Sequence, residues 1–225
     1  MPTAIVTGAS RGLGLALAEA LAGRGWRLVI DARDGVALEA AAAGLRERTE
    51  VVSVAGDVAD AAHREALVAA AGGPVQLLVN NASTLGASPL PELARYPLDE
   101  LERVFRVNAI APLALMQAVL PLLGEGARVV NVTSDAAVEA YEGWGGYGAA
   151  KAALEQISAV FAAEQPRLRV YAVDPGDMNT QMHQDAFPGE DISDRPPPSQ
   201  SVPGLLRLIE GDLPSGRYSA AAVAA

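Results

Sequence analysis

Short apolar runs alternate along the chain with longer segments of helical periodicity, and this alternation constrains the fold more than any other feature. The apolar runs predict strands over Ala4–Val6, Arg27–Ala32, Val51–Val54, Val75–Val79, Arg128–Thr133 and Leu168–Val173. The segments between them predict helices over Leu13–Ala22, Gly35–Arg48, Ala61–Ala71, Leu98–Leu123 and Tyr147–Ala163. Such alternation forms a parallel sheet with helices on both faces. The sequence therefore predicts an α/β fold, a single Rossmann-like, doubly wound parallel sheet.

The length of the chain, 225 residues, is typical of one α/β domain. No internal repeat or linker divides it, so residues 1–225 are expected to form a single domain. The segment Asn179–Pro203 is rich in proline and shows no periodicity, which is typical of a lid, a binding loop or a disordered segment. The last residues, Ala220–Ala225, are expected to be frayed.

The charge of the chain excludes one class of partner. The formal net charge is −10, and no cluster of Lys and Arg reverses this locally. Since affinity for phosphate backbones comes from Lys and Arg, no binding to nucleic acid is expected.

Other absences exclude further classes. The chain has no cysteine, which excludes disulfides and cysteine nucleophiles. No basic leader precedes the first strand, and the apolar stretch Ala109–Leu123 is interrupted by Pro112 and Pro121, so neither a signal peptide nor a membrane span is expected. His63 is expected at the surface and His183 in a solvated loop, with contact to a substrate as the alternative for His183. Two histidines so far apart indicate no metal site. A cytoplasmic location is the expectation.

A glycine-rich turn follows the first predicted strand and opens the first predicted helix. It has the spacing G-x-x-x-G-x-G over Gly8, Gly12 and Gly14. Glycines permit a tight turn in which backbone N–H groups approach a pyrophosphate, and the helix N-terminus favours negative charge. The alternative is an ordinary glycine turn, and the motif alone says nothing about the reaction.

Tyr147 and Lys151 form a Tyr-x-x-x-Lys motif on a predicted helix. Residues four apart share one helical face, so the phenol and the ammonium are expected in the same cleft. The cation is expected to lower the pKa of the phenol toward neutrality, where it can exchange a proton. Ser134 follows the fifth strand, at the edge where ligands bind, and its hydroxyl can donate to a carbonyl oxygen. By itself the motif is common by chance.

Together and in this order, these motifs resemble those of the short-chain dehydrogenase/reductase family. Asp57-Val58 follows the third strand, Asn80-Asn81-Ala82-Ser83 ends the fourth, and Pro175-Gly176 follows the sixth. The family normally has glycine where Ser83 stands. The resemblance implies hydride transfer between a nicotinamide cofactor and a carbonyl or alcohol, with catalytic residues Asn108, Ser134, Tyr147 and Lys151. In the family the matching Asn holds a water of a proton relay.

The resemblance also implies the cofactor contacts. The implied set is Gly8, Ser10, Arg11, Gly12, Leu13, Gly14, Arg33, Asp57, Val58, Asn80, Ala82, Tyr147, Lys151, Pro175, Gly176 and Thr180. By register against the family, Ala32 ends the second strand, so Arg33 and Arg11 are expected to bind a 2′-phosphate and to favour NADP(H). A slip of one residue would place Asp31 against the ribose and favour NAD(H). A third interpretation is that both arginines are solvated surface residues that do not contact a cofactor.

Other interpretations also remain open. The chain can be a non-catalytic dinucleotide-binding sensor, although no catalytic position is lost. The nucleotide-sugar epimerase branch also uses Tyr-x-x-x-Lys, but its members are generally longer and have another glycine spacing. The resemblance further implies a homodimer or homotetramer, formed through the helices Leu98–Leu123 and Tyr147–Ala163.

Overall fold

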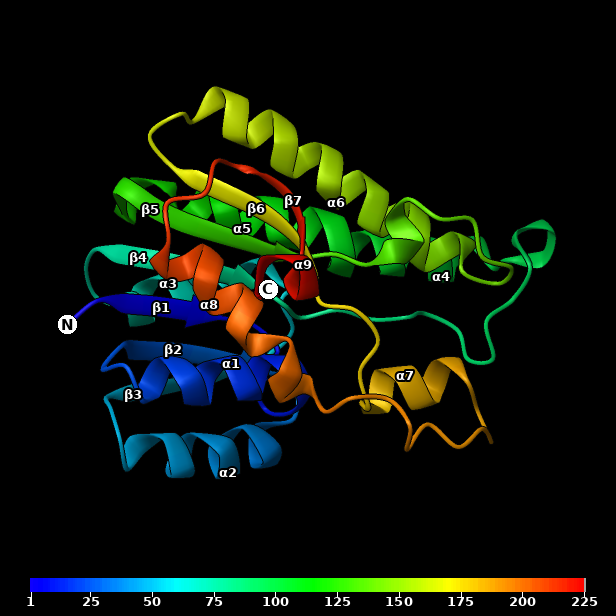
Figure 1. Cartoon of the computed structure of the whole chain (residues 1–225), viewed down its shortest axis with the longest axis horizontal. Helices are drawn as coiled ribbons and strands as arrows, with labels where there is room; N and C mark the ends of the chain where they lie inside the picture. The colour runs from blue at the N-terminus through cyan, green and yellow to red at the C-terminus, as the bar shows by residue number, and fades with distance from the viewer. Residues whose placement is uncertain (225) are drawn as a thin grey trace.

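A computed structural model describes residues 1–224 and shows a parallel sheet with helices on both faces (Figure 1). The seven strands run in the order β3-β2-β1-β4-β5-β6-β7. Every neighbouring pair is parallel, with Ile5 opposite both Val29 and Leu78 at the centre. The predicted fold class is therefore confirmed.

The strands are short and mostly buried. They span β1 (Thr3–Val6), β2 (Arg27–Ala32), β3 (Val51–Ala55), β4 (Val75–Asn80), β5 (Leu123–Val132), β6 (Arg169–Asp174) and β7 (Gly216–Ser219). The first six correspond to the six predicted strands, because continuous apolar runs of this length fit a sheet covered on both faces. The largest difference is at β5, which begins at Leu123 and not at Arg128. The seventh, at the edge of the sheet, was not predicted.

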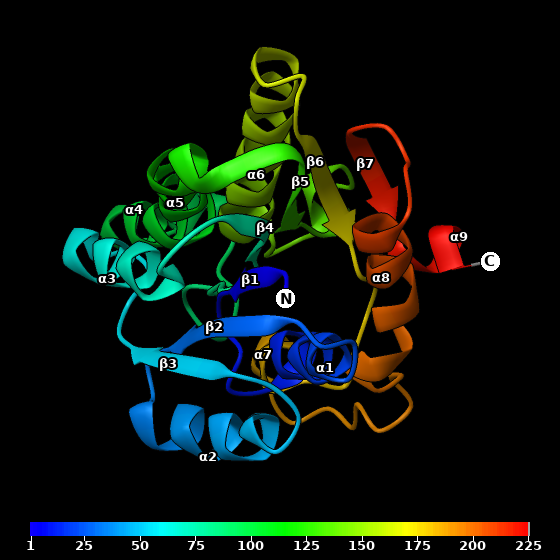
Figure 2. The same cartoon turned by 90° about the vertical axis from the view of Figure 1, so that its left-hand side faces the viewer.

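Helices cover the sheet in two layers, each with its own apolar core (Figure 2). One layer holds α1 (Gly12–Ala22), α2 (Gly35–Arg46) and α8 (Val202–Glu210). The other holds α3 (Ala61–Ala71), α5 (Ala111–Val119) and α6 (Gly145–Glu164). The helix α4 (Leu98–Phe105) precedes α5 in the chain. Asp60 caps α3 by accepting a hydrogen bond from the backbone of Ala62 at 3.0 Å.

The long predicted helix after β4 is divided. A π-helical turn, Arg106–Ile110, separates α4 from α5, and a 3-10 turn, Leu120–Leu122, ends the run. By length and composition alone, Leu98–Leu122 is apolar enough to cross a membrane, but half of its most apolar stretch is buried inside the protein. A partly buried helix of this kind also occurs in the cores of globular proteins.

The C-terminal third contains more regular structure than predicted. The segment Asn179–Pro203 includes α7 (Gln181–Ala186) and a 3-10 turn, Pro198–Gln200, and α8 starts within it. The expectation of an irregular segment is therefore wrong for the two ends, since Thr180 caps α7 and proline occupies the first turn of α8. It is correct for residues 187–197, which form no helix or strand. A short helix, α9 (Ala220–Ala224), replaces the expected frayed end. Ala225 lies outside the described residues.

Candidate active site

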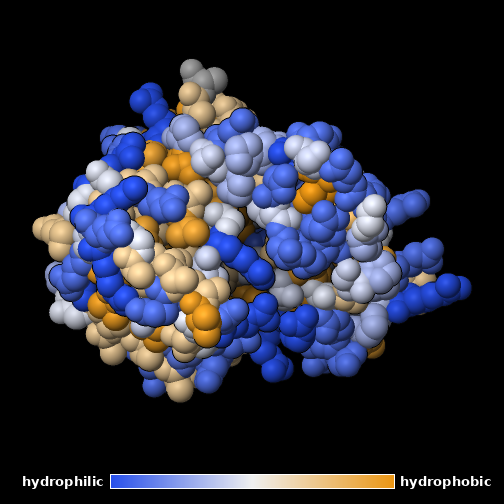
Figure 3. All heavy atoms as spheres, turned by 90° about the horizontal axis from the view of Figure 1, so that it is seen from below, coloured by the Kyte–Doolittle hydropathy of each residue, from blue (hydrophilic) through white to orange (hydrophobic). Residues whose placement is uncertain are grey.

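A cleft of about 1170 Å³ runs along the carboxyl edge of the sheet. It is lined by the turn after β1, by the ends of β2 to β6 and by the segment from Pro175 to Phe187. Seen from below, the surface has a hollow with hydrophilic side chains around it (Figure 3). This edge is where parallel sheets bind their ligands.

The glycine turn lies at one end of this cleft, and two of its glycines cannot be replaced without a clash. Gly8 has a φ of +65°, and a Cβ there would lie 2.9 Å from Cα of Ala82. A Cβ on Gly14 would lie 2.3 Å from the carbonyl oxygen of Gly8. The start of α1 therefore packs directly against the turn, as a backbone cradle for a phosphate requires.

Hydrogen bonds tie the turn to the end of β4. The Asn81 amide donates to the carbonyl oxygens of Thr7 and Gly8 at 2.9 and 3.0 Å, and the Thr7 hydroxyl accepts from the backbone of Asn81 and Ala82. The neighbouring Asn80 points into the core, where its side-chain amide donates to the Asn131 side-chain oxygen. The cleft is thus lined by Asn81, whereas the sequence suggested Asn80.

Asp31 and Arg33 lie at the end of β2, and a histidine expected at the surface lies buried beside Asp31. Arg33 is exposed at the cleft, but Asp31 is buried, and its carboxylate accepts hydrogen bonds from the Gly8 backbone at 2.6 Å and from His63 at 3.0 Å. The prediction that His63 lies at the surface is therefore wrong. It faces inward from the first turn of α3 because Asp31 offers it a buried partner.

Tyr147 and Lys151 lie one turn apart on α6, and both are buried. The Lys151 Nζ donates to the carbonyl oxygen of Val132 at 2.8 Å and lies 5.5 Å from the centre of the Tyr147 ring. Burial lowers the pKa of Lys151 to about 7. Burial also raises the pKa of Tyr147, and hydrogen bonds with Ser83 and Ser134 act in the opposite direction. The expected lowering of the Tyr147 pKa is therefore wrong for the protein by itself, because desolvation dominates both groups.

Two further hydroxyls lie close to the Tyr147 phenol. The Ser134 hydroxyl donates to Asp135 at 2.9 Å, and the Ser83 hydroxyl donates to the Asn108 side-chain oxygen at 3.1 Å. Asn108 lies in the π-helical turn, fully buried, and its amide also holds both backbone groups of Thr84. Asn108 therefore fixes the loop that carries Ser83. Ser83 departs from the family pattern and was given no role from the sequence.

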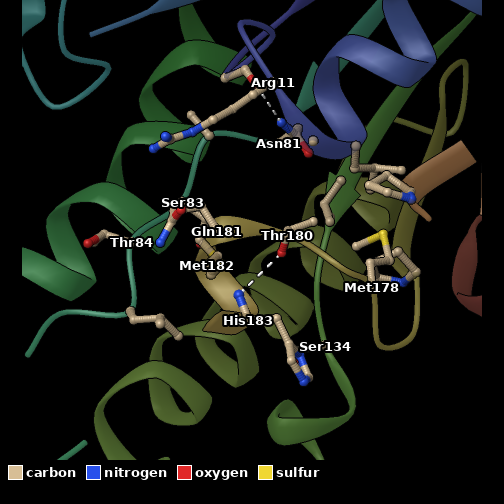
Figure 4. A pocket seen from close by; sticks show the side chains of 18 of the residues that line it. Arg11, Asn81, Ser83, Thr84, Ser134, Met178, Thr180, Gln181, Met182 and His183 are labelled. Carbon is tan, nitrogen blue, oxygen red and sulfur yellow. Dashed lines mark hydrogen bonds between the residues drawn. The ribbon is translucent and has the colours of Figure 1, made fainter. Parts of the chain in front are cut away.

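The helix α7 covers the other side of the cleft (Figure 4). His183, the Thr180 cap and Met182 lie on it or at its start, and the Thr180 hydroxyl accepts from the His183 backbone at 3.2 Å. The His183 ring packs against the Phe187 ring in a tilted arrangement with centroids 4.9 Å apart, and only 10% of the His183 side chain is exposed. The prediction of a solvated histidine is therefore wrong. Trp144 completes this apolar end, with its ring in an edge-to-face contact with Tyr147 and the ring centroids 5.6 Å apart.

Most of the residues that the sequence singled out meet in this one cleft. Those that line it are Gly8, Ser10, Arg11, Gly12, Leu13, Arg33, Asp57, Val58, Ala82, Ser134, Tyr147, Lys151, Pro175, Gly176 and Thr180. Gly14, Asn80 and Asn108 stand behind the lining and support it.

Comparison with known proteins gives consistent matches. The family model described as short chain dehydrogenase matches residues 2–191. Sepiapterin reductase of Mus musculus is 34% identical over 197 residues, which is 80% of this chain and 76% of that protein. A 3-oxoacyl-[acyl-carrier-protein] reductase of rhamnolipid biosynthesis from Pseudomonas aeruginosa is 33% identical over 191 residues, covering 80% of this chain and 73% of the relative.

Solved structures agree with these matches over nearly the whole chain. A short chain dehydrogenase structure from Pseudomonas syringae has a TM-score of 0.91 at 27% identity and covers 97% of this chain and 94% of its own. One from Shigella flexneri, complexed with NADP, has a TM-score of 0.88 at 27% identity and covers 98% and 97%. Because the family model covers most of the sequence, this chain belongs to the short-chain dehydrogenase family and is an oxidoreductase.

Proposed function

We propose that the chain transfers a hydride between NADP(H) and a small-molecule carbonyl or alcohol, as a single catalytic domain with Tyr147 as the acid and base. One observation carries the proposal. The Tyr147 phenol, the Lys151 ammonium and the Ser134 hydroxyl line the same cleft as the glycine turn. A nucleotide held by the turn would thus reach the residues that can exchange a proton with a substrate oxygen.

The residues present fit a dinucleotide. Gly8 and Gly14 form a backbone cradle that a side chain would fill. Arg11 and Arg33 are exposed at the cleft, and none of the ion pairs within residues 1–224 involves either of them. Two guanidiniums suit a 2′-phosphate in charge and geometry. The Asp31 carboxylate, which would favour NAD(H), is occupied by Gly8 and His63.

The protein groups supply the proton and the polarisation of the substrate. When bound, the nicotinamide would supply or accept the hydride. The Tyr147 Oη donates a proton to the substrate oxygen in reduction and accepts it in oxidation. The Ser134 hydroxyl donates to the same oxygen and stabilises its developing charge. Lys151, with a pKa of about 7, exchanges protons near neutral pH and can replace the proton that Tyr147 loses.

Cofactor titration tests the nucleotide half of this proposal. Wild type is expected to bind NADPH about ten- to a hundredfold more tightly than NADH, since charge-assisted contacts are strong but partly exposed here. Arg33→Ala is expected to reduce that preference. The matched control is Arg48→Ala, another exposed arginine, which does not line the cleft. Equal binding of both cofactors by wild type would contradict the proposal.

Turnover tests the chemical half. A panel of ketones and diketones with NADPH separates an enzyme from a cofactor-binding sensor, because only the enzyme consumes NADPH. We also propose that the segment Asn179–Pro203 closes over the nicotinamide end, since several of its residues line one wall of the cleft.

A homo-oligomer is proposed as well, and a cytoplasmic location remains a prediction from the sequence. Exposed apolar residues lie on the helices of one layer, with Leu98, Ile110 and Val160 between 45% and 72% exposed. Such residues suit contact with a second copy. Light scattering that gives the mass of one chain would contradict the oligomer.

A further inference from the structure

A buried carboxylate–imidazole pair lies at the nucleotide end of the cleft, with Asp31 among the residues that line the cleft and His63 behind them. The Asp31 side chain is 1% exposed and that of His63 is 6% exposed. One carboxylate oxygen accepts from the Gly8 backbone at 2.6 Å, and the other faces the His63 Nε2 at 3.0 Å. Since a carboxylate can only accept, Nε2 carries the proton in this contact.

His63 reaches this position through close packing between two strand ends. It extends from the first turn of α3 across Gly56, where a Cβ would lie 2.3 Å from the His63 Nδ1. The Gly56 backbone in turn donates to the Ala32 carbonyl at 3.0 Å. The imidazole therefore leaves no room for a larger residue at Gly56, and it joins the end of β2 to the end of β3.

The pair changes what the end of β2 offers to a ligand. A carboxylate at this place accepts hydrogen bonds from a ribose 2′-hydroxyl and repels a 2′-phosphate. Here both oxygens of Asp31 already have donors. Burial raises the pKa of Asp31, the donors from His63 and Gly8 act against that rise, and the Asp57 carboxylate adds to it. Asp57 is the other acidic group whose charge acts on this carboxylate, from the loop after the neighbouring strand β3.

We propose that His63 is a positioning residue that determines the cofactor preference, by holding Asp31 inward and away from the 2′ position of the nucleotide. This inference rests on the proposed use of NADP(H). Without the imidazole, Asp31 would be buried with an oxygen unpaired, and a buried unpaired charge is costly. The Asp31 carboxylate, already in the cleft wall, would then turn outward, where it repels a 2′-phosphate and accepts from a ribose hydroxyl.

Two nucleotides that differ by one phosphate test this without turnover. Adenosine 2′,5′-bisphosphate and adenosine 5′-monophosphate are titrated by calorimetry against wild type, His63→Leu, His63→Gln and Asp31→Asn. His63→Leu is expected to lower the preference for the bisphosphate about tenfold, a change typical of one charge near a surface. His63→Gln retains a donor and is expected to restore most of the preference. Glu65→Leu, an exposed change on the same helix, serves as the control and is expected to leave it unchanged.

A double variant separates positioning from a general loss of structure. In Asp31→Asn no charge needs a partner, so the combination of Asp31→Asn with His63→Leu is expected to fold and to keep the preference of Asp31→Asn. A merely structural role would weaken both nucleotides equally and leave their ratio unmoved, which would overturn the inference. A fall of the ratio when His63→Leu is added to Asp31→Asn would overturn it too. If wild type binds neither nucleotide, both the cofactor assignment and the inference about His63 fail. If wild type binds the nucleotides but shows no turnover, only the proposed reaction is contradicted.

Discussion

The two ends of the cleft are built differently. At the nucleotide end, backbone groups and buried polar side chains hold the turn after β1, through Thr7, Asn81 and the Asp31–His63 pair. At the opposite end, which we propose to bind the substrate, the wall is a six-residue helix, α7, packed by the side chains of Trp144, Met182 and Phe187.

This difference indicates that the two ends of the cleft select their ligands by different means. The nucleotide end recognises a fixed ligand, so donors are held in place before binding and little ordering is needed. The substrate end is closed by apolar contacts on a short element, which is easier to open and to vary. The predictions that follow test this comparison, from the largest expected effect to the smallest.

Tyr147→Phe is expected to lose about 10²- to 10⁴-fold in turnover, because the proton donor is removed while the ring stays. Affinity for NADPH is expected to change little, since the glycine turn at the other end is untouched. Steady-state kinetics and cofactor titration measure the two quantities. Tyr141→Phe is the control, because Tyr141 also lines the cleft but its hydroxyl donates to Asp135. Substantial residual turnover in Tyr147→Phe would exclude this residue as the acid.

Gly14→Ala is expected to destabilise the protein by about 1–3 kcal/mol, because the added Cβ overlaps the Gly8 carbonyl. Nucleotide affinity falls with it, as the turn must move. Gly44→Ala is the matched control: Gly44 lies within α2, and a Cβ there meets nothing within 4 Å. That change is expected to stabilise by about 0.5–1 kcal/mol. Urea denaturation measures both, and equal signs would contradict the rigid turn.

Lys151→Met is expected to stabilise the protein at low pH and to lose that advantage as pH rises. The Lys151 pKa falls from 10.5 to about 7 in the folded protein, so the unfolded chain binds more protons between these values. The contribution of Lys151 to stability therefore rises with pH across this window and is most unfavourable below about pH 7. Urea denaturation at about pH 6 and about pH 9.5 tests it. A difference between variant and wild type that does not depend on pH would contradict the buried lysine.

Thr180→Ala is expected to remove the cap of α7, at a local cost of about 1 kcal/mol. Hydrogen exchange of the α7 amides should become faster, while the melting temperature stays the same, because α7 opens independently of the core. Asp60→Ala removes the cap of α3, which packs on the sheet, and is expected to lower the melting temperature. If both variants melt like wild type, or both melt early, the two ends do not differ as described.

Local patterns in the sequence determined the fold class and most of the cleft. Six strands could be predicted because buried runs are short, apolar and regularly spaced. Tyr147 and Lys151 could be placed together because four residues make about one helical turn. The spacing of Val202, Leu205, Leu206 and Ile209 is also helical and indicates α8, but the prolines around these residues favour an irregular loop in the sequence pattern.

Only the tertiary structure decided how the polar groups are paired and charged. Asp31 and His63 are 32 residues apart, and no local pattern indicates that both side chains turn inward to meet. Asn81 lines the cleft and Asn80 points into the core, and this depends on where each side chain lies once β4 is packed in the sheet. Burial of Lys151 against Val132 sets its pKa, and burial is a property of the packed protein. The sequence by itself determined most of the groups that reach the cleft, because periodicity is local, whereas partners, desolvation and charge depend on contacts between distant segments.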